Sequence, residues 1–343
     1  MSEMASRISQ TRALLPALEA SLKAFQQSST PFKIIRSINL ASSNSNTNTP
    51  PLQPPTPIPS AKPKTLFILD SSYNPPSRAH LALATTALRT STDPAPRRLL
   101  LLFSTSNADK AAQPASFVHR IAMMILFAED LLLTLQQQQQ QSHNAVGERE
   151  AVEEVETGTG TETEIDVNVD VEIDIGLTKE PYYTSKSHAI TTALPPPYPS
   201  NPTHTHLLGY DTLTRFLSPK YYATHTPPLS ALSPFFDAGH KLLVLLRPSS
   251  SAPGTSSPQE EKEIQDQTLY ITTLPTPPLK HQGFNPSWSA QIATLQGPDV
   301  KEAAGISSTL IRAAVGDGEW GRVEGMCTPG VAAWIRGEGL YAE

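Results

Sequence analysis

The chain has 343 residues, of which 38% are apolar and 33 are proline, about twice the roughly 5% of proline in an average protein. This composition argues against two full domains and indicates one folded core interrupted by low-complexity segments. The net charge of −6 is uneven, because residues 148–174 hold eleven acidic residues and one arginine, a local −10; removing it from −6 leaves +4 elsewhere.

Several classes of protein are disfavoured. The single cysteine, Cys327, excludes an internal disulfide and a cysteine-based zinc site. No apolar stretch approaches the ~20 residues of a membrane span, and no run of lysine or arginine suggests a nucleic-acid groove. Glu3 and the lack of a long apolar segment at the N-terminus argue against a secretory signal. We therefore expect a protein of the cytoplasm or nucleus, with a mitochondrial location as a minor alternative, and no membrane or nucleic-acid partner.

The first expected element is a helix over residues 5–27, where apolar side chains recur on one face. We interpret residues 1–40 as an N-terminal helical extension and the Ser/Asn/Thr/Pro-rich residues 41–63 as a flexible linker. The main domain is then expected at 64–343. It begins with a buried strand at 65–69 and continues with a helix after His80, a second strand at 98–104 and a long helix from Ser116.

Two inserts of low complexity interrupt this domain. Residues from about 136 to 168 start with six glutamines and become acidic, and residues 248–267 are rich in Ser, Pro, Glu and Gln, so both are predicted to be disordered. Further strands are expected at 169–177, 206–209, 241–247 and 291–297. Strands that alternate with helices, several of them apolar throughout, predict a Rossmann-like parallel α/β sheet with helices on both faces.

The segment "LFILDSSYNPPSRAHLAL", residues 66–83, is the most informative one. An apolar strand ends in a polar, proline-stiffened turn, and a new apolar pattern begins at His80. In an open parallel sheet, ligands bind beyond the carboxyl ends of the strands, and helix N-termini attract anions. Ser77 is placed to cap the following helix and His80 lies on its first turn, so both are expected to face one bound polyphosphate.

These residues resemble a known family. "SSYNPPSRAH" is similar to the G-x-F/Y-N-P-x-T-x-x-H signature of nucleotidylyltransferases, in particular nicotinamide mononucleotide adenylyltransferases, and "GISSTLIR" matches the I-S-S-T-x-x-R signature of that superfamily. "HRIAMM", "GYDTLTRF" and "CTPGVAAWIRGEGLY" resemble further segments, and "SNADK" and "EPYYTSKSHAI" resemble the fungal branch. Apart from the inserts, the resemblance spans about 65–343. It departs at Ser71, where the family usually has glycine, and at Ser77, where it has threonine.

The resemblance implies adenylyl transfer from ATP to nicotinamide mononucleotide, which gives NAD and pyrophosphate. Mg²⁺ would bridge the ATP phosphates without dedicated protein ligands, and His80 and Arg312 would be catalytic. The residues that the resemblance places at ATP are Ser71, Ser72, Tyr73, Asn74, Ser77, His80, Gly209, Asp211, Ile306, Ser307, Ser308, Thr309 and Arg312. Candidates for contact with the mononucleotide or with phosphate are Lys110, Arg120, Lys186 and Arg247.

Two alternatives stay open. One is a related adenylyltransferase that acts on nicotinate mononucleotide or phosphopantetheine, because the motifs define the ATP half better than the acceptor half. The other is a nucleotide-binding regulatory protein that has lost transfer, which Ser71 and the long inserts would suit. The sequence does not determine the oligomeric state. The adenylyltransferase interpretation requires the strands before Asp70 and Ser307 to be neighbours or nearly so, with His80, Arg312 and Asp211 around one cleft.

Overall fold

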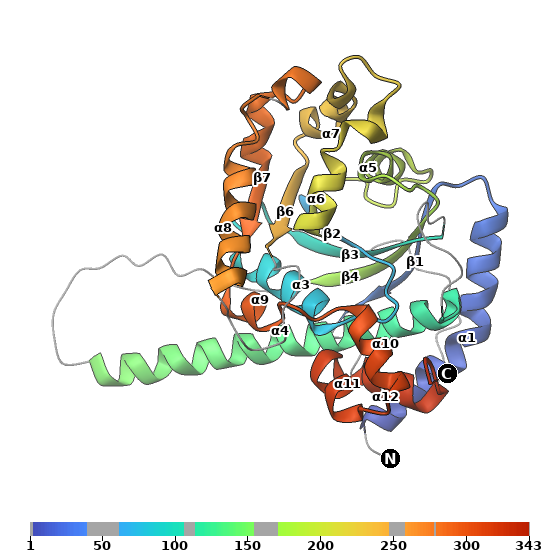
Figure 1. The fold of residues 1–343 in the computed structure, drawn as a ribbon. Helices are drawn as coiled ribbons and strands as arrows, with labels where there is room; N and C mark the ends of the chain where they lie inside the picture. The colour runs from blue at the N-terminus through green and yellow to red at the C-terminus, as the bar shows by residue number, and fades with distance from the viewer. Residues whose placement is uncertain are drawn as a thin grey trace.

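A seven-stranded sheet forms the centre of the protein. The computed structural model describes residues 3–39, 62–105, 114–153, 171–246, 258–277 and 279–342. Within them the strand order is β1-β4-β3-β2-β5-β6-β7 (Figure 1), and every neighbouring pair is parallel except β1 and β4. The strands are β1 (Phe32–Ile38), β2 (Thr65–Asp70), β3 (Arg97–Ser104), β4 (Glu172–Thr178), β5 (Thr203–Gly209), β6 (Lys241–Leu245) and β7 (Ile292–Leu295).

Helices cover both faces of this sheet. They are α1 (Glu3–Gln27), α3 (Arg78–Thr90), α4 (Phe117–Glu153), α5 (Tyr183–Thr192), α6 (Tyr210–Phe216), α7 (Ser233–Asp237), α8 (Pro258–Thr272), α9 (Pro298–Glu302), α10 (Ser308–Gly316), α11 (Trp320–Met326) and α12 (Pro329–Glu338). Four short 3₁₀ segments lie at Pro219–Tyr222, Pro228–Leu232, Lys280–Gln282 and Pro286–Gln291. Among the described residues, none of the helices combines the length and the apolar character that a membrane crossing requires.

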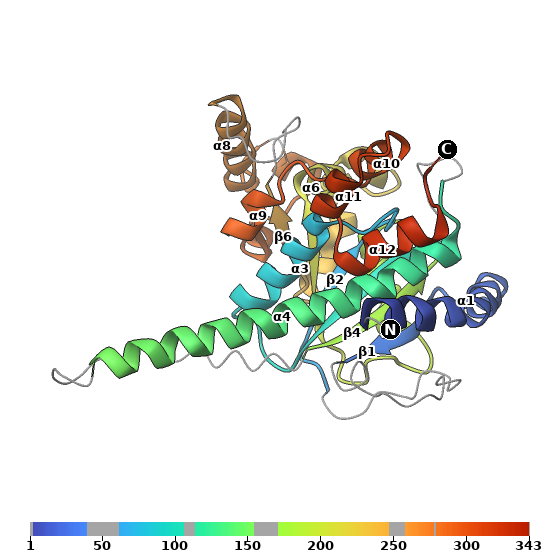
Figure 2. The ribbon, with the colours of Figure 1, turned by 90° about the horizontal axis from the view of Figure 1, so that it is seen from below.

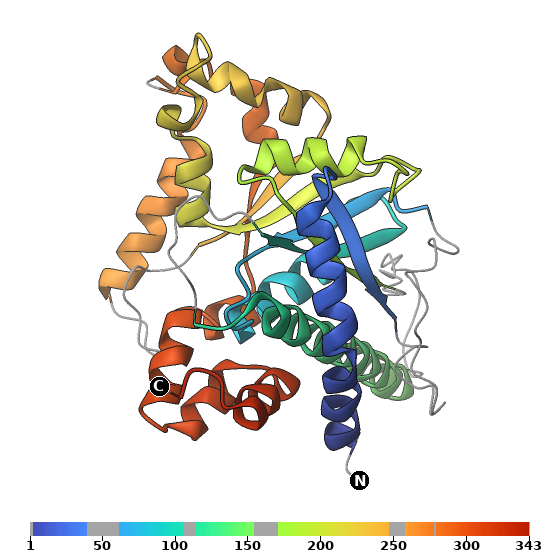
Figure 3. The same cartoon turned by 90° about the vertical axis from the view of Figure 1, so that its right-hand side faces the viewer.

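Alternate residues of the central strands pack on opposite faces. Phe67 and Leu69 of β2 belong to the larger core, which α1, α3, α4 and the C-terminal helices complete. Leu66 and Ile68 point to the other face and pack with residues of α5. Figure 3 shows α1 beside β1 and against α4, on the face of the sheet that carries the larger core. Since both faces are covered, the strands are apolar without alternation, and the predicted parallel α/β architecture is confirmed.

The order of the strands reverses at β2. After β2 the chain builds β3 and β4 on one side, then returns and builds β5, β6 and β7 on the other side. The chain that follows β2 therefore crosses toward β3, and the chain that follows β5 crosses the other way, toward β6. This is the switch point at which open α/β sheets leave a crevice for a ligand.

The N-terminal extension differs from the prediction. Residues 1–40 were expected to be helical, but β1 occupies Phe32–Ile38 and adds an antiparallel edge strand to β4. The sequence FKIIRSI contains three isoleucines, and its ends Phe32 and Ile38 are buried, so pairing and packing favour a strand here. Most of the expected linker at 41–63 lies outside the described residues.

The two inserts are also more ordered than predicted. Gln136–Gln141 continues α4, which extends to Glu153 and projects beyond the sheet (Figure 2). Glutamine is a good helix former, and the buried first half of α4 supplies the costly first turns. In the second insert α8 begins at Pro258, and Gln267 and Ile271 are buried. The remaining insert residues, 154–168 and 248–257, lie outside the described part of the chain.

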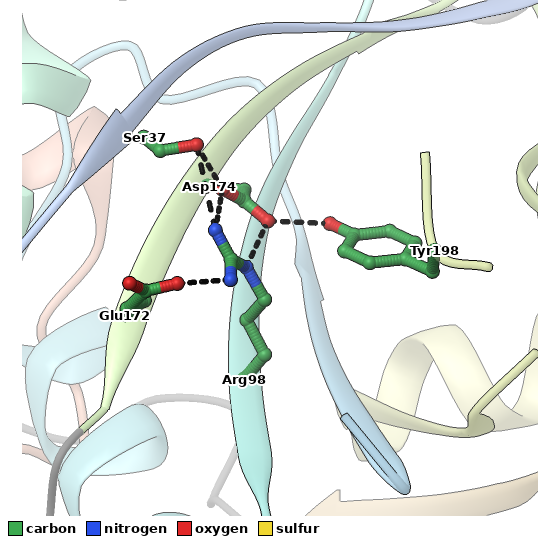
Figure 4. Close-up of polar contacts among 5 residues, drawn as sticks. All are labelled: Ser37, Arg98, Glu172, Asp174 and Tyr198. Carbon is green, nitrogen blue, oxygen red and sulfur yellow. Dashed lines mark hydrogen bonds and ion pairs between the residues drawn. The ribbon is translucent and has the colours of Figure 1, made fainter. Parts of the chain in front are cut away.

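A buried ionic network joins the edge strand to the sheet at the amino ends of β3 and β4 (Figure 4). Asp174 is fully buried and accepts hydrogen bonds from Arg98 Nε at 2.5 Å and Nη2 at 2.9 Å. It also accepts from Tyr198 Oη at 2.8 Å and from Ser37 Oγ of β1 at 2.5 Å. Arg98 makes a further ion pair with Glu172.

Candidate functional site

A cavity of about 700 Å³ opens at the carboxyl ends of the central strands. Residues from the β2 turn, from the start of α10, and from β3, β5, α4, α5 and α6 line it. Those that carry polar or charged side chains include Asp70, Ser71, Ser72, Ser77, His80, Ser104, Thr105, Arg120, Tyr182, Tyr183, Lys186, Thr212, Arg215, Ser307 and Ser308. The cavity therefore lies at the switch point of the sheet.

The turn after β2 is held rigidly. Tyr73 has a φ of 45°, which is uncommon for a bulky side chain, yet it is fully buried. Its hydroxyl donates to the Leu69 carbonyl at 2.5 Å. Asn74 is buried as well, and its side-chain oxygen accepts from Tyr341 Oη at 2.8 Å. Strain of this kind persists only where the surroundings enforce it, as at many ligand sites.

His80 is fixed by both of its ring nitrogens. Nδ1 lies 3.1 Å from the backbone nitrogen of Ser77 and 2.8 Å from Ser77 Oγ, and Nε2 lies 2.9 Å from Ser71 Oγ. Because a backbone N–H can only donate, Nδ1 is an acceptor here and the ring proton is on Nε2. The neutral ring therefore presents its N–H to Ser71.

The second signature lies directly against the first. Ser307 is the N-cap of α10, and its Oγ accepts from Leu310 N at 3.3 Å. Ser308 Oγ donates to the Pro75 carbonyl at 2.8 Å, and Arg312 Nη1 donates to the Asn74 carbonyl at 2.6 Å. Two segments more than 220 residues apart in sequence thus share one wall of the cavity.

The expected strand arrangement behind this contact was wrong. The strand before Ser307 is β7, which is separated from β2 by β5 and β6. The segment between β7 and α10 closes the gap, because α9 packs against α3 and the Arg89 side chain of α3 pairs with Asp299 at 3.1 Å. The meeting of the signatures therefore depends on this connection and not on adjacent strands.

Two predicted cations line the cavity. Lys186 of α5 is buried and forms an ion pair with the carboxylate of Asp70, the last residue of β2. Arg120 of α4 is 2% exposed, and its Nε and Nη2 donate to the Ala115 carbonyl at 3.0 and 2.9 Å. Burial lowers the pKa of Arg120, the charge of Arg312 lowers it further, and Tyr341 raises it. Among the described residues, Arg120 has no ion pair with an acidic side chain.

Some of the remaining predicted residues line the cavity and others do not. Ser72, Gly209 and Ile306 line the cavity with the residues above. Asp211, Thr309 and Arg312 are not lining residues: Asp211 and Thr309 are exposed, and Arg312 is half-buried and hydrogen-bonds Thr309 Oγ1 at 3.2 Å. The expectation that Asp211 and Arg312 share the cleft with His80 is therefore not met by their side chains. Lys110 and Arg247 lie outside the described residues.

The prediction missed several lining residues. Asp70 lies at the end of the first strand, and the end of a buried strand is itself a signal for such a position. Tyr182 and Tyr183 stand beside Lys186 in "EPYYTSKSHAI", and Arg215 lies within "GYDTLTRF". These residues were within quoted segments, but nothing in the sequence says that they face the cavity.

The described lining of the site supplies mainly hydroxyl groups and cationic side chains. In the ranges that the structure describes, no group of three or more His, Cys, Asp or Glu side chains is arranged to hold a metal ion. The one carboxylate among the lining residues, Asp70, is engaged by Lys186. A divalent cation at this site would depend chiefly on oxygen ligands that a nucleotide and water provide.

The sheet, its switch point and the cavity define a Rossmann-like α/β fold with a ligand crevice. No family model matches the chain. A Schizosaccharomyces pombe (strain 972 / ATCC 24843) protein named "Putative nicotinamide mononucleotide adenylyltransferase" is 27% identical over 256 residues, which cover 75% of this chain and 78% of the relative. This similarity agrees with the resemblance of the two signatures to those of the nucleotidylyltransferase superfamily.

Two solved structures of a Plasmodium falciparum nicotinic acid mononucleotide adenylyltransferase are also similar. The complex with NaAD superposes with a TM-score of 0.42 at 12% identity, over 81% of this chain and 97% of that chain. The complex with APC gives a TM-score of 0.39 at 10% identity, with the same coverage. TM-scores below 0.5 indicate a distant likeness, and no conclusion about the site rests on them.

Proposed function

We propose that this protein transfers the adenylyl group of ATP to a pyridine mononucleotide and releases pyrophosphate, with nicotinamide mononucleotide as the acceptor. The observation that carries the proposal is the contact between the two signatures. Ser308 and Arg312 bond the carbonyls of Pro75 and Asn74 beside a cavity lined by hydroxyls and by His80. The name of the S. pombe relative supports the acceptor.

In this reaction a phosphate oxygen of the mononucleotide attacks the α-phosphorus of ATP. The new O–P bond forms in line with the bond to the β-phosphate oxygen, which breaks and leaves with the pyrophosphate. The nucleophile is already an anion, so the reaction needs no general base and no covalent intermediate. The protein then contributes position and neutralisation of charge. Ser77, whose hydroxyl lies against His80, and the start of α10 would hold the phosphates, and Arg120 and Lys186 would add positive charge.

Magnesium is part of the proposal. Mg²⁺ retains several waters and binds phosphate oxygens readily, so it would enter with ATP and offset charge on the phosphates. The side chains present suit this arrangement, because the lining set is rich in hydroxyls and cations and its single carboxylate pairs with Lys186. The residues that hold the nucleotide would therefore act on phosphate oxygens directly.

The acceptor assay tests the proposal. Purified protein with ATP and MgCl₂ is incubated with nicotinamide mononucleotide, nicotinate mononucleotide or phosphopantetheine, and pyrophosphate and the dinucleotide product are measured. We expect the highest kcat/KM with nicotinamide mononucleotide. Preference for another acceptor would replace the substrate and keep the reaction class. ATP binding without product for any acceptor would favour the nucleotide-binding regulatory protein.

A matched pair of arginine variants ties the activity to this site. Arg312→Ala removes the contact of α10 with the Asn74 carbonyl, whereas Arg322→Ala removes an exposed arginine of α11 that pairs with Glu319, three residues before it. We expect Arg312→Ala to lower kcat/KM by about tenfold or more, because it removes the charged hydrogen bond that holds α10 against the turn after β2. Arg322→Ala should retain wild-type activity.

A further inference from the structure

The Ser71 hydroxyl has an unusual set of neighbours. Its oxygen lies 2.9 Å from His80 Nε2 and 3.5 Å from the backbone nitrogen of Tyr73. The tautomer of His80 follows from Ser77, whose backbone N–H can only donate to Nδ1 and so leaves the ring proton on Nε2. Both neighbours of the Ser71 oxygen are therefore donors.

A serine hydroxyl that accepts from two donors still has one proton to donate. Within the ranges that the structure describes, the contacts of Ser71 Oγ are these two, so its own proton has no protein acceptor. Ser71 is half-buried, lines the cavity and follows the last residue of β2. The unused proton is therefore available to a ligand in the cavity.

The same contact determines what His80 can do. A neutral imidazole with the proton on Nε2 has one N–H to donate, and Ser71 accepts it. A ligand phosphate that took this N–H directly would have to displace the Ser71 oxygen. A phosphate that instead accepts from the Ser71 hydroxyl leaves the His80 contact intact and lies at the end of a chain of two hydrogen bonds, each of which strengthens the other.

We propose that Ser71 is the side chain that donates to a nucleotide phosphate, and that His80 is the positioning residue behind it. This inference rests on the proposed function only for the identity of the ligand as ATP. A glycine at this position would leave no hydroxyl between the histidine and the ligand. With serine here, the phosphate contacts the Ser71 hydroxyl, and the hydroxyl in turn contacts His80. Ser77 and Ser71 together orient the histidine ring.

Three variants and two measurements test this role. Binding of ATP with MgCl₂ is measured by calorimetry for wild type, Ser71→Ala, Ser71→Gly and the control Ser287→Ala, whose exposed hydroxyl contacts Asn285. The Ser71→Ala variant should bind ATP about ten- to hundredfold more weakly, the usual effect of losing a hydrogen bond to a charged group. Ser71→Gly should lose less than about threefold, because without a Cβ the phosphate can approach His80 itself. Ser287→Ala should be unchanged.

Nitrogen NMR of His80 provides a readout that a purely structural role would not change. In wild type and in Ser71→Ala, Nε2 should carry the proton, since Ser77 N–H still faces Nδ1. Addition of ATP should shift the Nε2 resonance little in wild type and strongly in Ser71→Gly, where His80 contacts the phosphate directly. Wild-type affinity in Ser71→Ala, or an equally strong Nε2 shift in wild type, would overturn the proposal.

These results separate this proposal from the proposed function. If wild type binds ATP but forms no dinucleotide, adenylyl transfer fails, and the affinities and the Nε2 shifts still decide the role of Ser71. If wild type transfers normally and Ser71→Ala does too, the role of Ser71 fails and the proposed function stands. Absence of ATP binding in folded wild type would overturn both.

Discussion

Replacing Asp174 by asparagine should strongly destabilise the fold. The carboxylate is fully buried and accepts two hydrogen bonds from Arg98, one from Tyr198 and one from Ser37 (Figure 4). Burial alone lowers the pKa of Arg98, but the hydrogen bonds and charge of Asp174, with Glu172, raise it above its ordinary value. A guanidinium is not deprotonated in proteins even when burial lowers its pKa, so in the variant Arg98 stays charged and loses its main counter-charge.

The expected loss follows from this uncompensated charge. Removing one partner of a buried ion pair costs about 3–5 kcal/mol, because the remaining ion has lost both water and partner. Asparagine keeps one oxygen for the donors, so we expect about 3 kcal/mol for Asp174→Asn. The control is Glu172→Gln: this side chain is 27% exposed and pairs with the same Arg98, so about 1 kcal/mol or less is expected.

Urea unfolding followed by circular dichroism measures both variants. Activity per folded molecule should not change, because Asp174 lies four residues before the end of β4, about 13 Å from the carboxyl edge. The double variant Asp174→Leu, Arg98→Met should be more stable than Asp174→Leu alone, since it buries no unpaired charge. A loss below about 1 kcal/mol for Asp174→Asn, or equal losses for Asp174→Asn and Glu172→Gln, would refute this account.

Three further predictions concern charge and pH. Arg312→Lys should restore only part of the transfer lost in Arg312→Ala, as steady-state kinetics will show, because an ammonium cannot reproduce the planar fork of a guanidinium. Arg120→Met should raise the free energy of unfolding, since it removes a buried cation that has no acidic partner among the described residues; calorimetry should show at least about tenfold weaker binding of ATP or mononucleotide. Acid should weaken the fold: burial lowers the pKa of His204 to about 3, with His240 adding to the effect, and that of His240 to about 4. Imidazoles of the unfolded chain take up protons from about pH 6.5 downward, so the stabilisation is complete above that pH and falls as the pH drops toward the pKa values of the folded state. His240 alone should lower the free energy of unfolding by about 2 kcal/mol at pH 5, measured by urea titration, and His240→Phe should make stability depend less on pH.

The sheet was largely predictable because its strands are buried on both faces. Continuous apolar runs such as Leu66–Leu69 have no other good explanation at that length, and the strands at 65–70 and 97–104 lie close to where they were expected. The strand β1 was missed because its seven residues follow a helix and contain two positive charges, Lys33 and Arg36. Its place depends on pairing with β4, whose partner residues are more than 130 positions away.

Composition alone misjudged the inserts. Six consecutive glutamines suggest low complexity, but glutamine has a high helix propensity and the preceding turns of α4 are buried through Leu135. An existing helix removes the nucleation cost, so the polar residues that follow it extend it. Glu260 and Glu261 lie in the first turn of α8, where negative charge stabilises a helix. A count of charged residues misses this, because it ignores their position.

The site was predictable as two motifs and not as a set of contacts. The signatures name His80 and Arg312, but the pair of Lys186 with Asp70 joins residues 116 positions apart and has no local signal. The bond from Ser71 to His80 depends on side-chain rotamers, which the sequence does not determine. The sequence therefore shows that Ser71 departs from the signature, but only the structure shows that its hydroxyl contacts His80.

The charges around the cavity bear on what kind of ligand it takes. Among the described residues, the lining includes the cations Lys186, Arg120 and Arg215 and a single carboxylate, Asp70, so positive charge exceeds negative charge there. Since the Lys186 ammonium is paired with Asp70, the excess comes from the two arginines: Arg120 buried on the α4 wall, Arg215 exposed on α6. A buried guanidinium without an acidic partner is costly in the empty protein, and an anionic ligand offsets that cost. The positive charge of the described lining therefore favours an anionic ligand over a neutral one, which fits the ATP and the mononucleotide of the proposed function.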